Sequence, residues 1–278
     1  MVLSEETNDR PFAGLPPDFE TLYVENGLLR AELATLMEEA EYLVRVVIPQ
    51  TQTSYTIKIG ALRIESMQRQ VDVMKIRRRL VLVRDAQQRG KPANAAAFSS
   101  TIEREFREWD ERLRTELATL EDAKARFSSL TPPEDEPEVR SLYRILSRKM
   151  NPEINPEQSG EAGAFWPSIH AAYVSGDLFQ LKALLMMSDD YPESYDLPSN
   201  IGAMRETGDR LRKRIDYMNT RLRDIKSHRA FEWRKLLGDP ECLAKEQGRL
   251  REEIERFHIQ FVALSDMLKS LEMKKEIL

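Results

Sequence analysis

A seven-residue repeat of apolar side chains spans residues 19–47 and constrains the fold of this chain more than any other feature. Its positions are separated by alternating steps of three and four residues: Phe19, Leu22, Asn26, Leu29, Leu33, Leu36, Ala40, Leu43 and Val47. This spacing gathers side chains on one face of a long helix and is typical of a coiled-coil seam. Pro16 and Pro17 favour a helix start, and Pro49 is expected to end the helix.

Asn26 occupies a seam position that normally holds an apolar side chain. In parallel coiled-coil dimers, one asparagine at such a position can fix the register and the number of strands. The simpler interpretation is a mildly destabilising polar residue near the start of a helix. The sequence leaves both interpretations open.

Two further long helices are predicted before residue 131. A wide apolar stripe predicts a helix over residues 53–88, and a second seam predicts another over residues 95–130. Three helices joined by short turns favour an elongated antiparallel coiled-coil bundle over residues 18–130. Within this region, Lys75 and Arg77–Arg79 form a short basic run. Pairing with acidic neighbours is the simpler interpretation of this run, and contact with phosphate is the alternative.

The composition favours an all-α fold, because 32% of residues are charged and only 11 are glycine. The net charge of -5 gives no reason to expect attraction to nucleic acid or to an anionic membrane. The longest apolar runs are too short to span a membrane. Cys242 is the only cysteine, which excludes a disulfide within the chain. We expect a cytoplasmic protein whose residues 1–17 form a disordered leader.

The C-terminal region carries two more helical stripes, over residues 201–238 and 240–278, after a break at residues 188–200. The stretch Gly238–Pro240 predicts the end of one helix followed by the start of another. The first stripe is rich in arginine and lysine, and the second carries more acids. Complementary charge and similar length predict an antiparallel helical hairpin over residues 197–278.

Residues 137–188 differ in kind from the long helices, and the proline-rich acidic stretch 131–138 marks the boundary before them. Residues 138–150 predict a short amphipathic helix with a basic face, and Pro152 forces the chain out of it. Asn-Pro-Glu follows at 151–153, and Asn-Pro-Glu-Gln at 155–158. A second helix, a cap at Gly176 and Asp177, and a last apolar helix complete the segment.

The order of these features resembles a J domain, the module that docks on DnaK-type chaperones and stimulates their ATPase. The resemblance covers about 50 of the 278 residues, and it lacks a recognisable first family helix. The family has a basic helix with a tyrosine, then His-Pro-Asp, then a loop that often contains Asn-Pro. The resemblance implies a docking surface on the basic helix and at its tip: Arg140, Tyr143, Arg144, Arg148, Lys149, Asn151, Pro152 and Glu153.

The tip departs from the family pattern, because Asn151 and Glu153 replace the histidine and the aspartate. An asparagine side chain neither takes up a proton nor carries a charge. Glu153 keeps the negative charge but places it one methylene further out. We therefore expect weak docking on a DnaK-type chaperone without stimulation of its ATPase.

No known catalytic motif is recognisable in the sequence. His170, His228 and His258 are isolated in sequence, and neither a metal-ligand spacing nor a glycine-rich phosphate loop is present. We predict no catalytic residue, no metal and no cofactor. The predicted function is a non-catalytic helical adaptor that binds unknown protein cargo or self-associates through its seams. The alternative is a coiled-coil scaffold with no chaperone link, and a nucleic-acid binder using Arg77–Arg79 or the first C-terminal stripe is the least favoured.

Overall fold

The computed structural model describes residues 17–90, 94–127, 135–155, 161–188 and 201–273, and every regular element within these ranges is a helix. The all-α prediction is confirmed for this part of the chain. The chain forms two compact units, each built from two separate stretches. Unit 1 comprises Met1–Ile48 and Pro132–His228, and unit 2 comprises Pro49–Thr131 and Arg229–Leu278. No described helix is both long and apolar enough to cross a membrane. The leader expected over residues 1–17 lies almost wholly outside the described ranges.

Helical residues follow one another from Pro17 to Gln88 as α1 (Pro17–Tyr42), the π-helical turn η1 (Leu43–Val47), α2 (Ile48–Tyr55), the π-helical turn η2 (Thr56–Gly60) and α3 (Ala61–Gln88). The prediction that Pro49 ends a helix is therefore wrong. In η1 the backbone N–H of Ile48 bonds to the carbonyl of Leu43, five residues back. A single π-helical turn shifts the hydrogen-bond register, which accommodates the ring and the missing N–H of the proline that follows.

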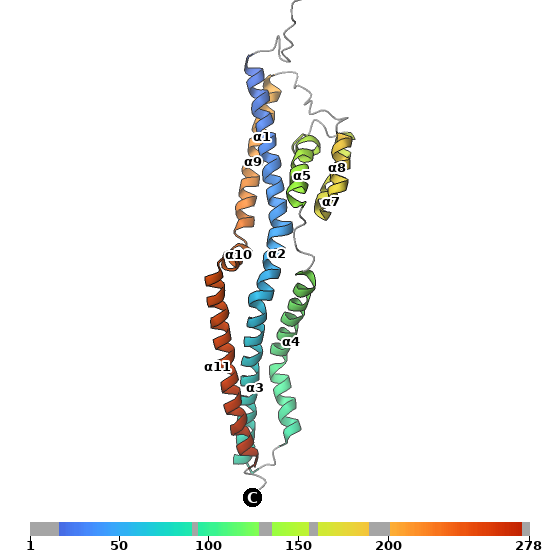
Figure 1. The fold of residues 1–278 in the computed structure, drawn as a ribbon. Helices are drawn as coiled ribbons and strands as arrows, with labels where there is room; N and C mark the ends of the chain where they lie inside the picture. Colours follow the sequence, from blue (N-terminus) through green and yellow to red (C-terminus); the bar gives the residue numbers. More distant parts are fainter. Residues whose placement is uncertain (1–16, 91–93, 128–134, 156–160, 189–200, 274–278) are drawn as a thin grey trace, which may run out of the picture. The chain divides into compact units, whose positions relative to one another are not determined.

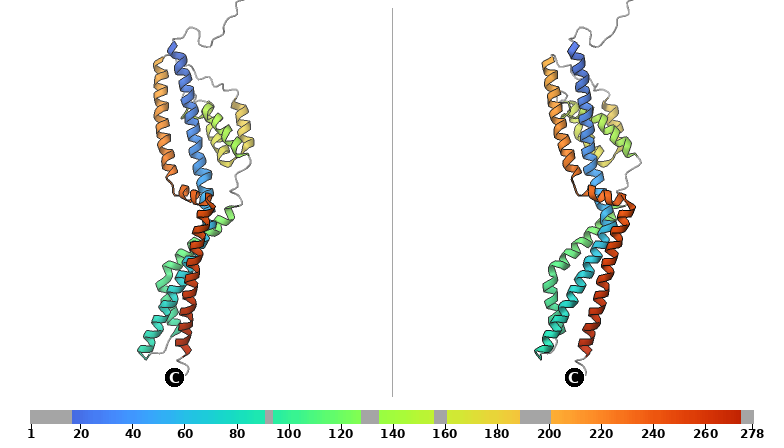
Figure 2. Two further views of the ribbon diagram at one scale, coloured as in Figure 1. Left: turned by 60° about the vertical axis from the view of Figure 1, so that its left-hand side comes forward. Right: turned by 90° about the vertical axis from the view of Figure 1, so that its left-hand side faces the viewer.

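In unit 1, α1 runs parallel to α9 (Ile201–Lys226), and Figures 1 and 2 show the two helices side by side. Acids along α1 meet bases along α9 in the same order, from Asp18 with Arg205 at 3.7 Å to Glu39 with Lys226 at 2.7 Å. The predicted hairpin over residues 197–278 is wrong. The basic side chains of α9 find their acidic partners on α1, and α11 (Pro240–Met273) packs against α3 instead.

The seam of α1 is buried largely as its spacing predicts, with Leu33 and Ala40 among the least exposed side chains. Asn26 is also buried, and its Nδ2 donates to the Met204 carbonyl of α9 at 2.9 Å. Opposite it lies Gly208, where an added Cβ would come within 2.8 Å of Asn26 Oδ1. The seam asparagine thus has a specific partner on a parallel helix, which the same chain supplies.

The rest of unit 1 is a small set of helices within residues 136–188, called the helical module below. It contains α5 (Glu136–Met150), α6 (Glu161–Ala164), α7 (Trp166–Ser175) and α8 (Leu178–Met187). The cap predicted between its last two helices is confirmed. Gly176 has a left-handed φ of 71°, and Asp177 accepts a hydrogen bond from the Gln180 N–H at 2.9 Å. The core of the module joins α5, α7 and α8: Val139, Leu142, Tyr143, Leu146, Met150, Ile169, Ala172, Tyr173, Leu181 and Leu184.

Unit 2 is built around α3, which packs against α4 (Ala95–Phe127) and α11. The α3–α4 pair is antiparallel, because Lys75 meets Asp110 at 2.6 Å and Arg78 meets Glu105 at 2.8 Å. This pair is the part of the predicted antiparallel bundle that the structure contains, since the partner of α1 is α9. The basic run of α3 pairs with neighbouring side chains, as its simpler interpretation predicts.

The end of unit 2 nearest α2 is closed by α10 (Ala230–Gly238). Trp233 of α10 stacks on Tyr55, with ring centroids 4.2 Å apart and planes 8° from parallel. The predicted stop and start at Gly238–Pro240 are confirmed as the end of α10 and the start of α11. Asp239 caps α11, accepting hydrogen bonds from the N–H groups of Glu241 and Cys242 at 3.0 Å.

Candidate functional site

The Asn-Pro-Glu tip follows α5 directly. Asn151 is extended, with φ -75° and ψ 119°, as expected for a residue before proline. Its Oδ1 accepts a hydrogen bond from the Glu153 N–H at 2.9 Å, which closes the turn. Its Nδ2 lies 3.7 Å from the Met37 sulfur on α1, and the residue is 0% exposed. Asn151 is therefore a buried amide with a structural role.

The second asparagine of the motif, Asn155, is also buried. Its Nδ2 donates to the backbone carbonyls of Arg148 and Lys149, the latter at 3.3 Å. Carbonyls in the last turn of a helix lack intrahelical partners, so Asn155 acts as a side-chain cap of α5. The repeated Asn-Pro thus has a local physical reason: one asparagine shapes the turn, and the other closes the helix before it.

The helical module is attached to α1 through a buried carboxylate. Glu38 is 1% exposed and binds both ends of the Arg140 guanidinium, with Arg140 Nη2 donating to Oε2 at 3.1 Å. The Tyr173 hydroxyl donates to the same carboxylate at 3.2 Å. Hydrogen bonding of the guanidinium to the Glu38 carboxylate is the main cause that raises the pKa of Arg140 above its usual value. The guanidinium also lies 3.8 Å from the centroid of the Tyr42 ring.

Arg45 of η1 adds a second attachment. Its Nη1 donates to the Val174 carbonyl at 2.8 Å, and its guanidinium lies 4.2 Å from the centroid of the Tyr173 ring. Burial is the main cause that raises the pKa of Tyr173, and the Glu38 charge adds to it. We call this set the docking cluster: Glu38, Tyr42, Arg45, Arg140 and Tyr173. The sequence pattern does not reveal this cluster, because a charged residue between seam positions usually faces solvent.

The predicted docking surface is only partly exposed. Arg140 and Asn151 contact α1, and Tyr143 lies in the module core, stacked 3.9 Å from Tyr173. Arg144 is exposed, whereas Arg148 and Lys149 are half-buried. Arg140, the first member of the expected basic face, binds Glu38 of α1 and is half-buried.

The tip itself faces α9 across an open groove of about 510 Å³. Glu153 forms an ion pair with Arg214, whose guanidinium lies 5.0 Å from the centroid of the Tyr217 ring. We call this the tip groove. It is lined by Pro152, Glu153, Arg210, Leu211, Lys213, Arg214 and Tyr217. Three cations and one carboxylate give the groove a net positive charge. The sequence does not predict this groove, because the tip and α9 are far apart in the chain.

Comparisons with protein-family models, with characterised proteins and with solved structures find no match for this chain. Within the described ranges, no group of three or more histidine, cysteine, aspartate or glutamate side chains is placed to hold a metal ion.

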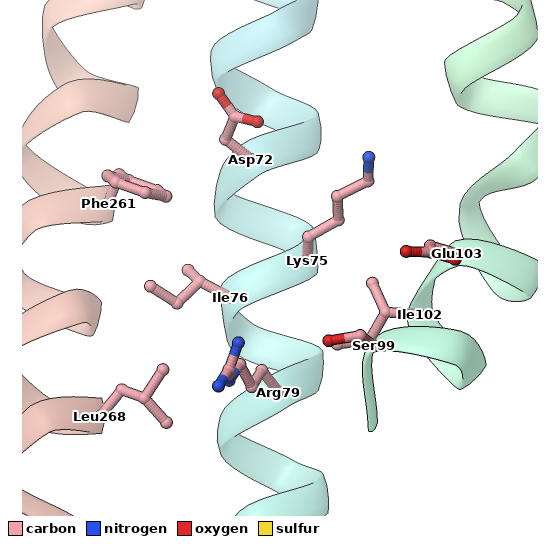
Figure 3. A pocket seen from close by; sticks show the side chains of 9 residues that line it. All are labelled: Asp72, Lys75, Ile76, Arg79, Ser99, Ile102, Glu103, Phe261 and Leu268. Atoms are coloured by element: carbon pink, nitrogen blue, oxygen red, sulfur yellow. The ribbon is translucent and has the colours of Figure 1, made fainter. Parts of the chain in front are cut away.

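Unit 2 contains a separate cavity of about 330 Å³, where α4 and α11 flank α3. Figure 3 shows Ile76, Phe261 and Leu268 on the α11 side and Lys75 extending toward α4. Burial is the main cause that raises the pKa of Asp72, and Lys75 offsets part of this effect. Lys75, which lines this cavity, is already paired with Asp110.

Proposed function

We propose that the protein is a non-catalytic helical adaptor, in which the helical module is a docking surface held on the α1–α9 pair. The partner that the resemblance implies is a DnaK-type chaperone, bound without stimulation of its ATPase. The exposed Arg144 and the neighbouring Arg148 and Lys149 would make the contact, and the long helices would carry cargo.

One observation supports the non-stimulating part of this proposal above all others. The two tip positions that would act on a partner are both engaged within the chain, Asn151 in the turn and Glu153 with Arg214. A buried amide supplies neither a proton nor a charge to a neighbouring protein.

The test is the steady-state ATPase rate and binding of a DnaK-type chaperone with the full chain. The proposal expects weak binding, about tenfold weaker for Arg144→Glu, and no rate increase at saturation. Phe179→Ser, on the exposed surface of α8, is a control that should bind normally. Absence of binding in both the ATP and ADP states would remove the chaperone partner, and a stimulated rate would remove the non-stimulating role.

A coiled-coil scaffold that self-associates is the second candidate. It is favoured by exposed apolar residues one turn apart on α1, where Val24 is 54% and Leu28 67% exposed. The discriminating substitution is Leu28→Glu, because Leu33 is already covered within the chain. Light scattering after size exclusion should show an oligomer that Leu28→Glu dissociates; a native monomer at all concentrations would exclude this candidate.

A further inference from the structure

Two sets of cations on α9 have different surroundings. One set faces the acids of α1, as Arg205, Arg212 and Lys226 do. The other set, Arg210, Lys213 and Arg214, lines the tip groove together with Tyr217. These four residues follow the i, i+3, i+4, i+7 spacing, which places them along one face of the helix. Within the described residues, Lys213 and Arg214 of this second set form no ion pair with α1.

The groove already binds a carboxylate that belongs to the chain itself. Glu153 pairs with the Nη2 end of Arg214, while the buried Nε of that guanidinium has no hydrogen-bond partner. Lys213 is exposed and forms no ion pair within the described residues. The site thus holds more positive charge and more donor capacity than one carboxylate satisfies.

We propose that the tip groove binds an acidic, extended peptide segment of a partner protein. One carboxylate of the segment replaces Glu153 on Arg214, and another reaches Lys213. Pro152 and the exposed ring of Tyr217 supply apolar surface for the intervening side chains. Arg210 and Arg214 lie one helical turn apart, about 6 Å along the axis. This spacing is close to that of alternate side chains on an extended chain, whereas a compact anion needs donors that converge on one point. This proposal does not depend on the partner being a chaperone.

The experiment is fluorescence anisotropy with a fluorescein-labelled peptide of six Glu-Gly repeats and the full chain. The matched probe of six Gln-Gly repeats controls for the backbone. We expect saturable binding of the acidic probe only, weakened as salt rises. Lys213→Glu should raise Kd about tenfold or more, because it replaces an attraction by a repulsion. Arg223→Glu, the same charge change on an exposed cation of α9 outside the groove, should change Kd less than twofold.

Glu153→Gln is the most discriminating variant, because it removes the carboxylate that competes with the probe for Arg214. We expect Kd to fall several-fold, and Asp224→Asn, the same charge change elsewhere on α9, should not reproduce that fall. Equal effects of Lys213→Glu and Arg223→Glu would overturn the proposal. So would a single-stranded oligo(dT) of equal charge that binds more than tenfold tighter with the same sensitivity to Lys213→Glu, since the groove would then recognise nucleic acid.

Discussion

Each unit contains one parallel helix pair, α1 with α9 in unit 1 and α3 with α11 in unit 2, yet the two units bury different kinds of side chain. Unit 1 buries charged and amide side chains: Asn26, Arg30, Glu38, Asn151 and Asn155. The buried polar side chains described in unit 2 are hydroxyls only: Thr51, Thr53 and Ser66. The ion pairs of α3 in unit 2, such as Arg78 with Glu105, lie near the surface.

This difference determines which unit restricts its helices to a single packing arrangement. A buried polar group destabilises a fold unless a partner meets it with good geometry, so each one in unit 1 admits few alternative packings. Exposed ion pairs are screened by solvent and select a packing only weakly. Unit 1 is thus held in one arrangement by a few contacts, and the tip groove depends on that arrangement.

The largest effect should come from Glu38→Ala, which leaves the Arg140 guanidinium without its carboxylate. Breaking a buried ion pair costs about 3 kcal/mol of unfolding free energy. Urea unfolding followed by circular dichroism measures it. Adding Arg140→Leu should restore most of the loss, because the unpaired charge is then gone. Glu105→Ala in unit 2 is the matched control and should leave the transition almost unchanged; an equal loss there would erase the contrast between the units.

Glycine-to-alanine substitutions should have opposite signs in the two units. Gly208→Ala places a Cβ 2.8 Å from Asn26 Oδ1 and should destabilise unit 1 by about 2 kcal/mol. Gly248→Ala on α11 meets nothing within 4 Å and should stabilise unit 2 by up to about 1 kcal/mol through helix propensity. Calorimetry of both variants gives the signs. Asn26→Ala should relieve the clash in the Gly208→Ala background, and an unrelieved loss would argue against this contact.

Two asparagine caps provide a third comparison. Asn155→Ala removes two hydrogen bonds to the end of α5 and should cost about 1.5 kcal/mol of unfolding free energy. Asn94→Ala removes an exposed cap of α4 and should cost about 1 kcal/mol or less. Hydrogen exchange should show faster exchange at the C-terminal turn of α5 only for Asn155→Ala. The same fast exchange in native protein would mean that the cap does not form.

The smallest effect concerns Asp72 at the cavity of unit 2. Its pKa is raised by burial above the usual range of aspartate, so folding favours the protonated form. Stability from this group is fully present below the usual aspartate pKa and is lost as pH rises through the raised pKa. Asp72→Asn should therefore raise the unfolding midpoint slightly at pH 7 but not at pH 3. A lower midpoint at pH 7 would show that the attraction of Lys75 outweighs burial.

Local features of the structure were predictable from sequence because short-range rules decide them. The seam of α1, the cap at Gly176 and the exit at Pro152 follow from spacing and backbone preferences. Pro49 was mispredicted, because a π-helical turn before it is not encoded by any simple pattern. The partner of α9 was mispredicted because both α1 and α11 carry acids, and Glu25 lies 187 residues from Arg212. The docking cluster and the tip groove depend on such long-range pairings, which helical periodicity does not specify.

The most direct test of this account is whether the helical module is fixed on α1 in solution. Spin labels at Glu32→Cys and Gln180→Cys, both exposed positions of unit 1, report the separation of α1 and α8 in a Cys242→Ser background. The account predicts a single narrow distance distribution by pulsed electron paramagnetic resonance, broadened by Glu38→Ala. A broad distribution in the otherwise native chain would contradict it, because the tip groove would then have no fixed geometry.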